Sequence, residues 1–200
     1  MRLQAVLFDL HGVFQHFDNK GAAEGERAAR LEPGTLAHYA YDHPSYEEAK
    51  VGLMSDEEWA EGVTRRLVAD FGERARAAVP PWRADRGRRD TAMISLLQQI
   101  RTSVPCGILS NFTDAMRRDL DHHGIRADHA FASADLHVTK PSPLAFRAAA
   151  ERMGVDPAQL YYFDDQPGFV TGARAAGIPA DVFTTPAAVA QRLRRLGVQI

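Results

Sequence analysis

The sequence predicts an α/β protein whose parallel sheet is doubly wound and whose first strand is followed by a helical insertion. Three short apolar runs, each ending at polar residues, carry this prediction: Ala5–Phe8, Cys106–Leu109 and Tyr161–Phe163. Runs of this length are typical of strands in a parallel sheet that is covered on both faces. A weaker run at Asp181–Phe183 predicts a fourth strand.

Helical patterns separate the later runs. Asp90 is placed to cap the first of these helices, and Thr113 is expected to cap the second, which ends at Gly124. The segment PSPLAFRAAAERMG predicts a third helix that begins at its prolines and ends at Gly154. Strand and helix therefore alternate from about residue 90 onward, and this alternation indicates a doubly wound sheet.

The region from 16 to 80 has no clear strand and is predicted to be helical. Two serine–glutamate pairs have the spacing of a capping box, Ser45 with Glu48 and Ser55 with Glu58. The second pair opens a helix in which apolar residues recur every four positions from Trp59. The arginine-rich segment VPPWRADRGRRD that follows is expected to be a solvated return linker.

These patterns divide the chain into two parts. Residues 1–15 and 81–200 are predicted to form the α/β core, and residues 16–80 a small helical domain inserted into it. The 200 residues of the chain are enough for a core domain with one insertion.

Composition limits the classes of partner. The net charge of −2 argues against the broad basic surface that nucleic acid requires. Cys106 is the only cysteine, so the chain cannot form an internal disulfide or a zinc site of several thiolates, and a reducing cytoplasm fits best. The apolar-rich run after Met1 and Arg2 ends at Asp9, which is too short for a signal peptide, and no run approaches the roughly 20 residues of a membrane span. A soluble protein of the cytoplasm with no membrane or nucleic-acid partner is expected, and its oligomeric state is left open.

Polar residues follow the predicted strands at the points where ligands bind to open α/β sheets. They come from four separate segments and are Asp9, the pair Ser110 and Asn111, Lys140, and the pair Asp164 and Asp165. Carboxylates that converge repel one another and take up protons unless cations neutralise them. Mg²⁺ suits such a site because it prefers oxygen ligands and is commonly held by one or two carboxylates together with a phosphate. A phosphoryl group bound there would be open to attack by Asp9, which would give an aspartyl-phosphate.

Four motifs that contain these residues occur in order: FDLHGVF, ILSN, KPSPLAF and YYFDDQPGFVTGARAAG. In this arrangement the chain resembles the haloacid dehalogenase-like (HAD) hydrolase superfamily over nearly its whole length. The resemblance implies a Rossmann-like HAD core. The helical insertion is similar to the cap of the superfamily's first subclass, which closes over the site and helps to select substrates.

The resemblance also implies a role for each site residue. Asp9 would be the nucleophile, Ser110 with Asn111 would hold the phosphoryl oxygens, and Lys140 would steady the nucleophile and the phosphate. The metal would be held by four residues, namely Asp9, the backbone carbonyl of His11, Asp165 as an inner ligand and Asp164 in support.

His11 departs from the pattern of the family's phosphatases, which carry a second aspartate at this position as the general acid and base. Imidazole can do both jobs, since its ordinary pKa of about 6.5 lies near the working pH. The main hypothesis is therefore a Mg²⁺-dependent phosphatase of a small phosphorylated metabolite, in which His11 replaces that aspartate. Two alternatives stay open, a catalytically impaired phosphate- and metal-binding or regulatory protein, and a non-phosphate hydrolase such as a 2-haloacid dehalogenase. The family's dehalogenases need no metal, and the acidic pair Asp164 and Asp165 argues against their chemistry.

Other polar residues have simpler interpretations. His122 and His123 precede a helix-ending glycine and are expected to be structural. The arginines from Arg83 to Arg89 are expected to be solvated. The insertion contains no motif that identifies a substrate.

Overall fold

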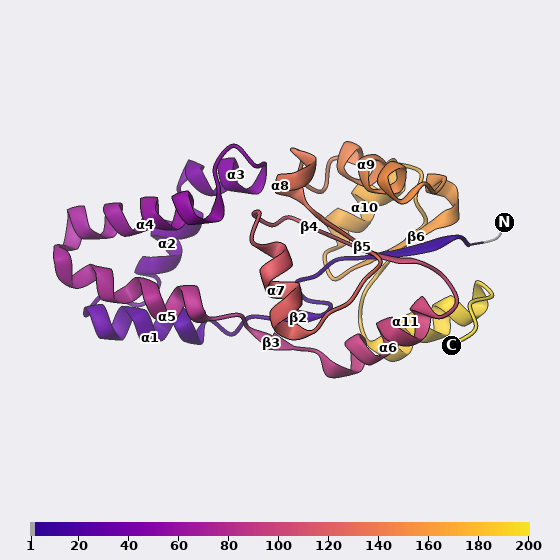
Figure 1. The fold of residues 1–200 in the computed structure, drawn as a ribbon, viewed down its shortest axis with the longest axis horizontal. Coiled ribbons are helices and arrows are strands. Elements are labelled where there is room, and N and C mark those ends of the chain that lie inside the picture. The colour runs from indigo at the N-terminus through magenta and orange to yellow at the C-terminus, as the bar shows by residue number, and fades with distance from the viewer. Residues whose placement is uncertain (1–2) are drawn as a thin grey trace.

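The structure is a computed structural model that describes residues 3–200, so that Met1 and Arg2, included in the predicted core, lie outside the described residues. The chain forms a layered α/β part and a helical part that lie side by side along the longest axis of the molecule (Figure 1). Two short strands lie where the chain passes between the two parts.

The central sheet has five parallel strands, which confirms the predicted fold class. Its strands are β1 (Ala5–Phe8), β4 (Cys106–Ser110), β5 (His129–Ala132), β6 (Leu160–Asp164) and β7 (Ala180–Val182), in the order β5-β4-β1-β6-β7. Every residue of β1, β4 and β6 is buried. The three central strands are thus covered on both faces, as their unbroken apolar runs predicted.

Helices cover both faces of the sheet (Figure 1). They are α6 (Thr91–Arg101), α7 (Met116–His123), α8 (Ser133–Leu136), α9 (Pro143–Met153), the short 3₁₀ helix η2 (Pro157–Gln159), α10 (Pro167–Ala175) and α11 (Pro186–Arg195). Successive residues of β1 point to opposite faces, so that Phe8 packs in the cluster with α6 and α11 while Leu7 packs with α9 and α10. Among the described residues, no helix combines the length and the apolar character needed to cross a membrane.

The insertion is helical and has an apolar core of its own. Its helices are α1 (Lys20–Ala29), α2 (Thr35–Tyr41), α3 (Pro44–Lys50), α4 (Asp56–Phe71), the 3₁₀ helix η1 (Glu73–Ala78) and α5 (Val79–Ala84). Trp59 and the residues that follow it at every fourth position of α4 lie in this core, as predicted. The helical part runs past residue 80 to the end of α5, and the domain boundaries stay a prediction.

The capping box at the start of α4 is confirmed. Ser55 Oγ accepts a hydrogen bond from the Glu58 backbone N–H at 3.2 Å, and Glu58 Oε2 accepts one from the Ser55 N–H at 2.9 Å. The other predicted box, at Ser45 and Glu48, is wrong. Helix α3 begins at Pro44, whose fixed φ favours the first helical position, and His43 is the capping residue.

The predicted cap at Thr113 is also wrong. Helix α7 begins at Met116, with Ala115 as the residue before it, and the Thr113 hydroxyl donates a hydrogen bond to Asp56 Oδ1 of the insertion at 2.9 Å. Thr113 thus joins the core to the insertion.

The chain leaves and re-enters the core through a small antiparallel sheet. Its strands are β2 (Gln15–His16) and β3 (Arg88–Arg89), in which Gln15 pairs with Arg89 and His16 with Arg88. These strands are not predictable from the sequence, because two residues are too few to show a periodic pattern.

Candidate active site

Three carboxylates meet at the carboxyl edge of the sheet. Asp9 follows β1, Asp164 ends β6, and Asp165 comes next. The pairing of Phe8 with Phe163 sets β1 and β6 in register, so that Asp9 and Asp164 leave the sheet side by side. One carboxylate oxygen from each of the three residues lies within 4.8 Å of the others. The predicted convergence of these distant segments is therefore confirmed.

Lys140 lies between two of these carboxylates. Its Nζ donates hydrogen bonds to Asp9 Oδ1 and to Asp164 Oδ2, each at 2.7 Å, and its side chain is 1 % exposed. A third bond at 2.9 Å reaches the hydroxyl of Tyr162, which itself donates to Asp164 Oδ2. Tyr162 is not among the site residues predicted from the sequence. The signal was available, because residues two apart on a strand face the same side of the sheet.

Asn111 holds the loop that carries Lys140. Its Nδ2 donates to the Lys140 carbonyl at 2.8 Å, and its Oδ1 accepts from the Lys140 backbone N–H at 2.7 Å. Ser110 is buried at the end of β4, next to β1. The structure thus places Ser110 at the same edge of the sheet as the carboxylates and Asn111 against the backbone of Lys140, and their binding of phosphoryl oxygens stays a prediction.

The site carries an excess of negative charge. Burial raises the pKa of Asp9, and the nearby charge of Asp164 raises it further against the opposing effect of Lys140. Burial, together with the charges of Asp9 and Asp164, raises the pKa of Asp165 to about 6. Three carboxylates face one ammonium group, and all of the donor atoms are oxygens. This donor set fits a hard divalent cation such as Mg²⁺.

His11 is held by aromatic packing. Its ring lies 4.9 Å from the ring of Phe112 and 5.3 Å from that of Phe17, measured between centroids. Burial lowers the pKa of His11 to about 4, so that the free imidazole is neutral at pH 7. Its Nε2 is buried and has no hydrogen-bond partner within residues 3–200. Two residues after Asp9 the structure therefore places an imidazole nitrogen that has no partner in the described part of the chain.

Gly12 leaves the space that the Asp165 carboxylate occupies. Its φ is +80°, and a Cβ at this position would lie 2.2 Å from Asp165 Oδ2. Only glycine combines this backbone conformation with so close an approach.

We expect Gly12→Ala to weaken Mg²⁺ binding by about 10-fold or more, because the added methyl group displaces the Asp165 carboxylate. Calorimetric titration with Mg²⁺ measures this change. Gly154→Ala is the matched control, since Gly154 has a φ of +68° but no atom within 4 Å of an added Cβ. If both variants bind Mg²⁺ like the wild type, Gly12 does not position Asp165 for a metal.

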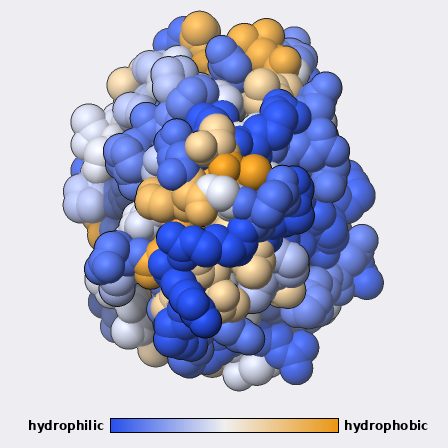
Figure 2. Space-filling view, turned by 90° about the vertical axis from the view of Figure 1, so that its left-hand side faces the viewer, coloured by the Kyte–Doolittle hydropathy of each residue, from blue (hydrophilic) through white to orange (hydrophobic). Residues whose placement is uncertain are grey.

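A cavity of about 520 Å³ lies between the helical part and the core. On the core side its wall includes His11, Phe112 and Thr113, and on the side of the insertion it includes both tryptophans, Trp59 and Trp82. The outer face of the insertion is mostly hydrophilic with small apolar patches (Figure 2). Both tryptophans also belong to the insertion's own apolar core.

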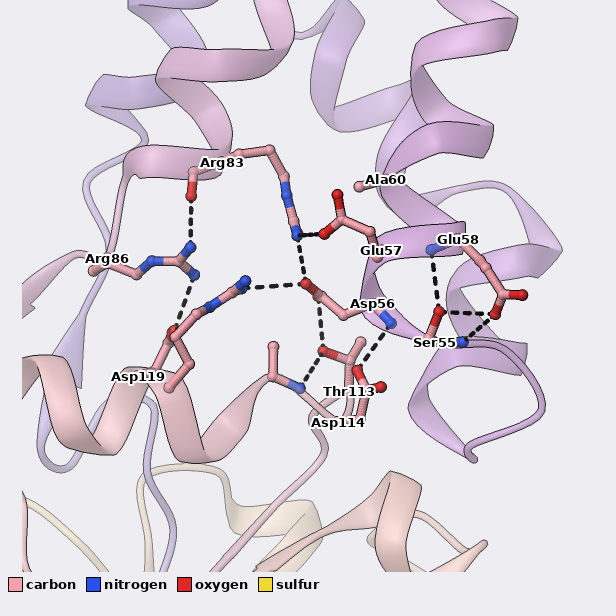
Figure 3. Close-up of polar contacts among 12 residues, drawn as sticks. Ser55, Asp56, Glu57, Glu58, Ala60, Arg83, Arg86, Thr113, Asp114 and Asp119 are labelled. Carbon is pink, nitrogen blue, oxygen red and sulfur yellow. Dashed lines mark hydrogen bonds and ion pairs between the residues drawn. The ribbon is translucent and has the colours of Figure 1, made fainter.

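Ion pairs join the two parts along the wall of this cavity (Figure 3). Asp56, at the start of α4, accepts hydrogen bonds from Arg83 Nη2 at 2.6 Å and from Arg118 Nη2 at 3.2 Å. Arg86 Nη1 donates to Asp119 Oδ1 at 2.9 Å, and Asp119 is buried. The expectation that Arg83 and Arg86 are solvated is wrong, because both side chains are held in these ion pairs. The pairs could not be predicted, since the partners are distant in sequence and no local pattern reveals them.

His123 has the structural role expected of it, since its Nε2 lies 2.6 Å from the Arg86 carbonyl oxygen. Arg88 and Arg89 are exposed, as expected.

The family model for haloacid dehalogenase-like hydrolases matches residues 3–177. This protein belongs to that family. The HAD match spans all four sequence motifs and confirms the resemblance and the enzyme class, while the helical cap subclass stays a prediction.

Similar proteins include a phosphatase and structures of HAD enzymes. Phosphatase MT3486 of Mycobacterium tuberculosis is 28% identical over 195 residues, which cover 90% of this chain and 87% of that protein. A HAD family enzyme of Bacteroides thetaiotaomicron, in complex with magnesium and inorganic phosphate, has a TM-score of 0.72 at 19% identity, covering 91% of this chain and 94% of that one. A 2-haloacid dehalogenase of Pseudomonas syringae pv. Tomato DC3000 has a TM-score of 0.67 at 16% identity, covering 96% and 99%. At these identities the two structures show the fold that the HAD hydrolases share.

Proposed function

We propose that this HAD hydrolase is a Mg²⁺-dependent phosphatase that acts on a small phosphorylated metabolite through a phosphorylated Asp9. The observation that carries this proposal is the cluster of three carboxylates at the edge of the sheet, in which the buried Asp9 and Asp164 share the ammonium group of Lys140 and the exposed Asp165 lies beside them. A phosphate dianion would add negative charge to a cluster that already has an excess of it. A divalent cation is therefore needed to hold the phosphate beside the carboxylates. The mycobacterial phosphatase and the magnesium–phosphate complex of the Bacteroides enzyme support the same class of reaction.

Four residues would hold the metal. We assign Asp9, Asp165 and the backbone carbonyl of His11 as its protein ligands, with Asp164 in support. Mg²⁺ bound there supplies positive charge that draws electron density from the phosphoryl oxygens.

The chain's own residues then perform two displacements. The Asp9 carboxylate attacks phosphorus, and the bond from phosphorus to the leaving oxygen breaks. The His11 imidazole, which takes up a proton when the phosphate dianion binds beside it, gives that proton to the leaving oxygen. Water next attacks the phosphorus of the aspartyl-phosphate while His11 takes a proton from it, which releases phosphate and restores the carboxylate. Lys140 stabilises Asp9 and the phosphate by charge, and Ser110 with Asn111 holds the phosphoryl oxygens.

We also propose that the insertion is a cap of the first HAD subclass. Its helices form one side of the cavity that begins at His11, so a leaving group there would contact the insertion.

The test is phosphate release from a panel of phosphomonoesters, including a generic aryl phosphate, with Mg²⁺ and with EDTA. We expect turnover that falls by about 100-fold or more in EDTA and returns when Mg²⁺ is added. Binding of Mg²⁺ and phosphate without turnover would support the impaired binding protein instead. Metal-independent halide release from a 2-haloacid would replace the phosphatase with a dehalogenase.

A further inference from the structure

Four aromatic side chains of the insertion line the cavity and form one cluster, the aromatic cluster: Tyr41, Tyr46, Trp59 and Trp82. Neighbouring ring centroids lie 5.0 Å apart for Tyr41 and Tyr46, 5.1 Å for Tyr46 and Trp59, and 5.2 Å for Trp59 and Trp82. Trp59 and Trp82 are buried, whereas Tyr41 is 45 % exposed. Such rings offer both faces and edges to a further ring at the separations that aromatic pairs prefer.

The cavity begins beside the proposed phosphate site. On its core side it is lined by His11, two residues after Asp9, and by Phe112, which directly follows Ser110 and Asn111. A phosphoryl group at Asp9 would therefore direct its leaving group into the cavity. The volume of about 520 Å³ lies within the range of pockets that hold small organic ligands.

The positive charges on the cavity wall are already paired. Three arginines line it, Arg83, Arg86 and Arg118, together with four carboxylates, Glu26, Asp56, Asp85 and Asp119. Each arginine forms an ion pair with one of these carboxylates. Among the described residues that line the cavity, there is no excess of positive charge for a second anionic group of a substrate.

We propose that the cavity binds an uncharged aromatic leaving group, so that the substrates are phosphomonoesters of alcohols or phenols that carry an aromatic ring and no second anion. This inference rests on the proposed function, because it takes the ester's phosphoryl group to be bound at Asp9. The aromatic cluster contacts the ring of the leaving group. The paired arginines discriminate against a carboxylate or a second phosphate, since either would face unpaired carboxylate charge or have to break a buried ion pair.

The experiment compares three esters whose leaving groups are all primary alcohols. Benzyl phosphate carries the ring, cyclohexylmethyl phosphate replaces it with an aliphatic ring of similar size, and 4-carboxybenzyl phosphate adds an anion. With Mg²⁺ we expect kcat/KM for benzyl phosphate to exceed that for the cyclohexylmethyl ester by about 5-fold. We expect it to exceed that for the carboxylated ester by about 30-fold or more.

Binding is measured separately from turnover. Benzylphosphonate and cyclohexylmethylphosphonate cannot be hydrolysed at their carbon–phosphorus bonds by this chemistry. Trp59 and Trp82 are the only tryptophans of the sequence, so intrinsic fluorescence reports occupancy of the cavity. We expect tighter binding of benzylphosphonate and a larger change in fluorescence.

Two variants of Tyr41 test whether the preference for the benzyl ester comes from the aromatic cluster. Tyr41 is partly exposed and lies outside the buried core of the insertion, so the fold should tolerate its replacement. In Tyr41→Ala we expect the benzyl preference to fall below about 2-fold, because one ring of the cluster is lost. Tyr41→Phe keeps the ring and should keep the preference.

A charge variant tests the discrimination against anions. Asp56→Asn keeps the shape of the side chain and removes the charge that Arg83 and Arg118 share, while Arg83 keeps its ion pair with Glu57. We expect the preference for benzyl phosphate over 4-carboxybenzyl phosphate to fall by about 5-fold or more.

The outcomes separate this inference from the proposed function. Hydrolysis of all three esters at similar rates would overturn the assignment of the cavity and leave the phosphatase intact. Absence of hydrolysis, with benzylphosphonate still preferred and sensitive to Tyr41→Ala, would overturn the phosphatase and support the ligand class of the cavity. Absence of hydrolysis together with equal binding of the two phosphonates would overturn both.

Discussion

Asp9→Asn is expected to lower the Mg²⁺-dependent turnover of any phosphomonoester substrate by about 10,000-fold or more, because an amide oxygen is a poor nucleophile and residual catalysis comes from binding alone. The fold should survive. The variant removes one charge from three crowded carboxylates, and an asparagine oxygen can still accept the hydrogen bond from Lys140. Phosphate release measures the loss. Mass spectrometry of acid-quenched wild-type enzyme should find a phosphoryl group on the peptide that contains Asp9.

Asp156→Asn is the matched control for this substitution. Asp156 accepts a hydrogen bond from the Ala158 backbone N–H at 2.8 Å on an exposed turn, and asparagine caps such a turn equally well. Its turnover should equal that of the wild type. Turnover that survives Asp9→Asn would show that the reaction does not pass through an aspartyl-phosphate at this position.

Lys140→Met is expected to lower the free energy of unfolding by about 3–5 kcal/mol when the protein is unfolded in urea with EDTA present. Methionine fills a similar volume but leaves Asp9 and Asp164 buried without the ammonium group that they share. Addition of Mg²⁺ should recover part of the loss, because a divalent cation can replace the missing charge.

The control uses the same substitution at an exposed ion pair. Lys20 pairs with Asp18, and both side chains are more than half exposed, so Lys20→Met should leave stability close to that of the wild type. If Lys140→Met in EDTA is as stable as Lys20→Met, then the carboxylates do not depend on Lys140. In that case proton uptake by Asp9 would be sufficient to relieve the repulsion.

The sheet and the carboxylate cluster could be predicted because both follow from local patterns. The buried strands β1, β4 and β6 are unbroken apolar runs, and parallel strands bring the residues after them to one edge. The proximity of Asp9 and Asp164 can therefore be predicted without any knowledge of how the helices pack. Strand β5 was missed because it is short and two of its four residues are only partly buried.

The cavity wall could not be predicted, since its ion pairs join residues that are distant in sequence. Asp56 belongs to the insertion, whereas Arg118 belongs to a helix of the core, and only the packing of the two parts makes them neighbours. For the same reason Arg83 was expected to be solvated. The neutral state of His11 also depends on packing, because Phe17 and Phe112 bury its ring.

The pairing of β2 with β3 has an evolutionary consequence. Since the outgoing and returning segments are bonded to each other beside the sheet, the stem of the insertion is closed before any of its helices begins. We expect that a shorter, longer or unrelated set of helices on that stem would leave the register of β1 against β4 and β6 unchanged. We therefore expect relatives to diverge in ligand preference by exchanging whole helical modules, while the acidic edge of the sheet is inherited unchanged.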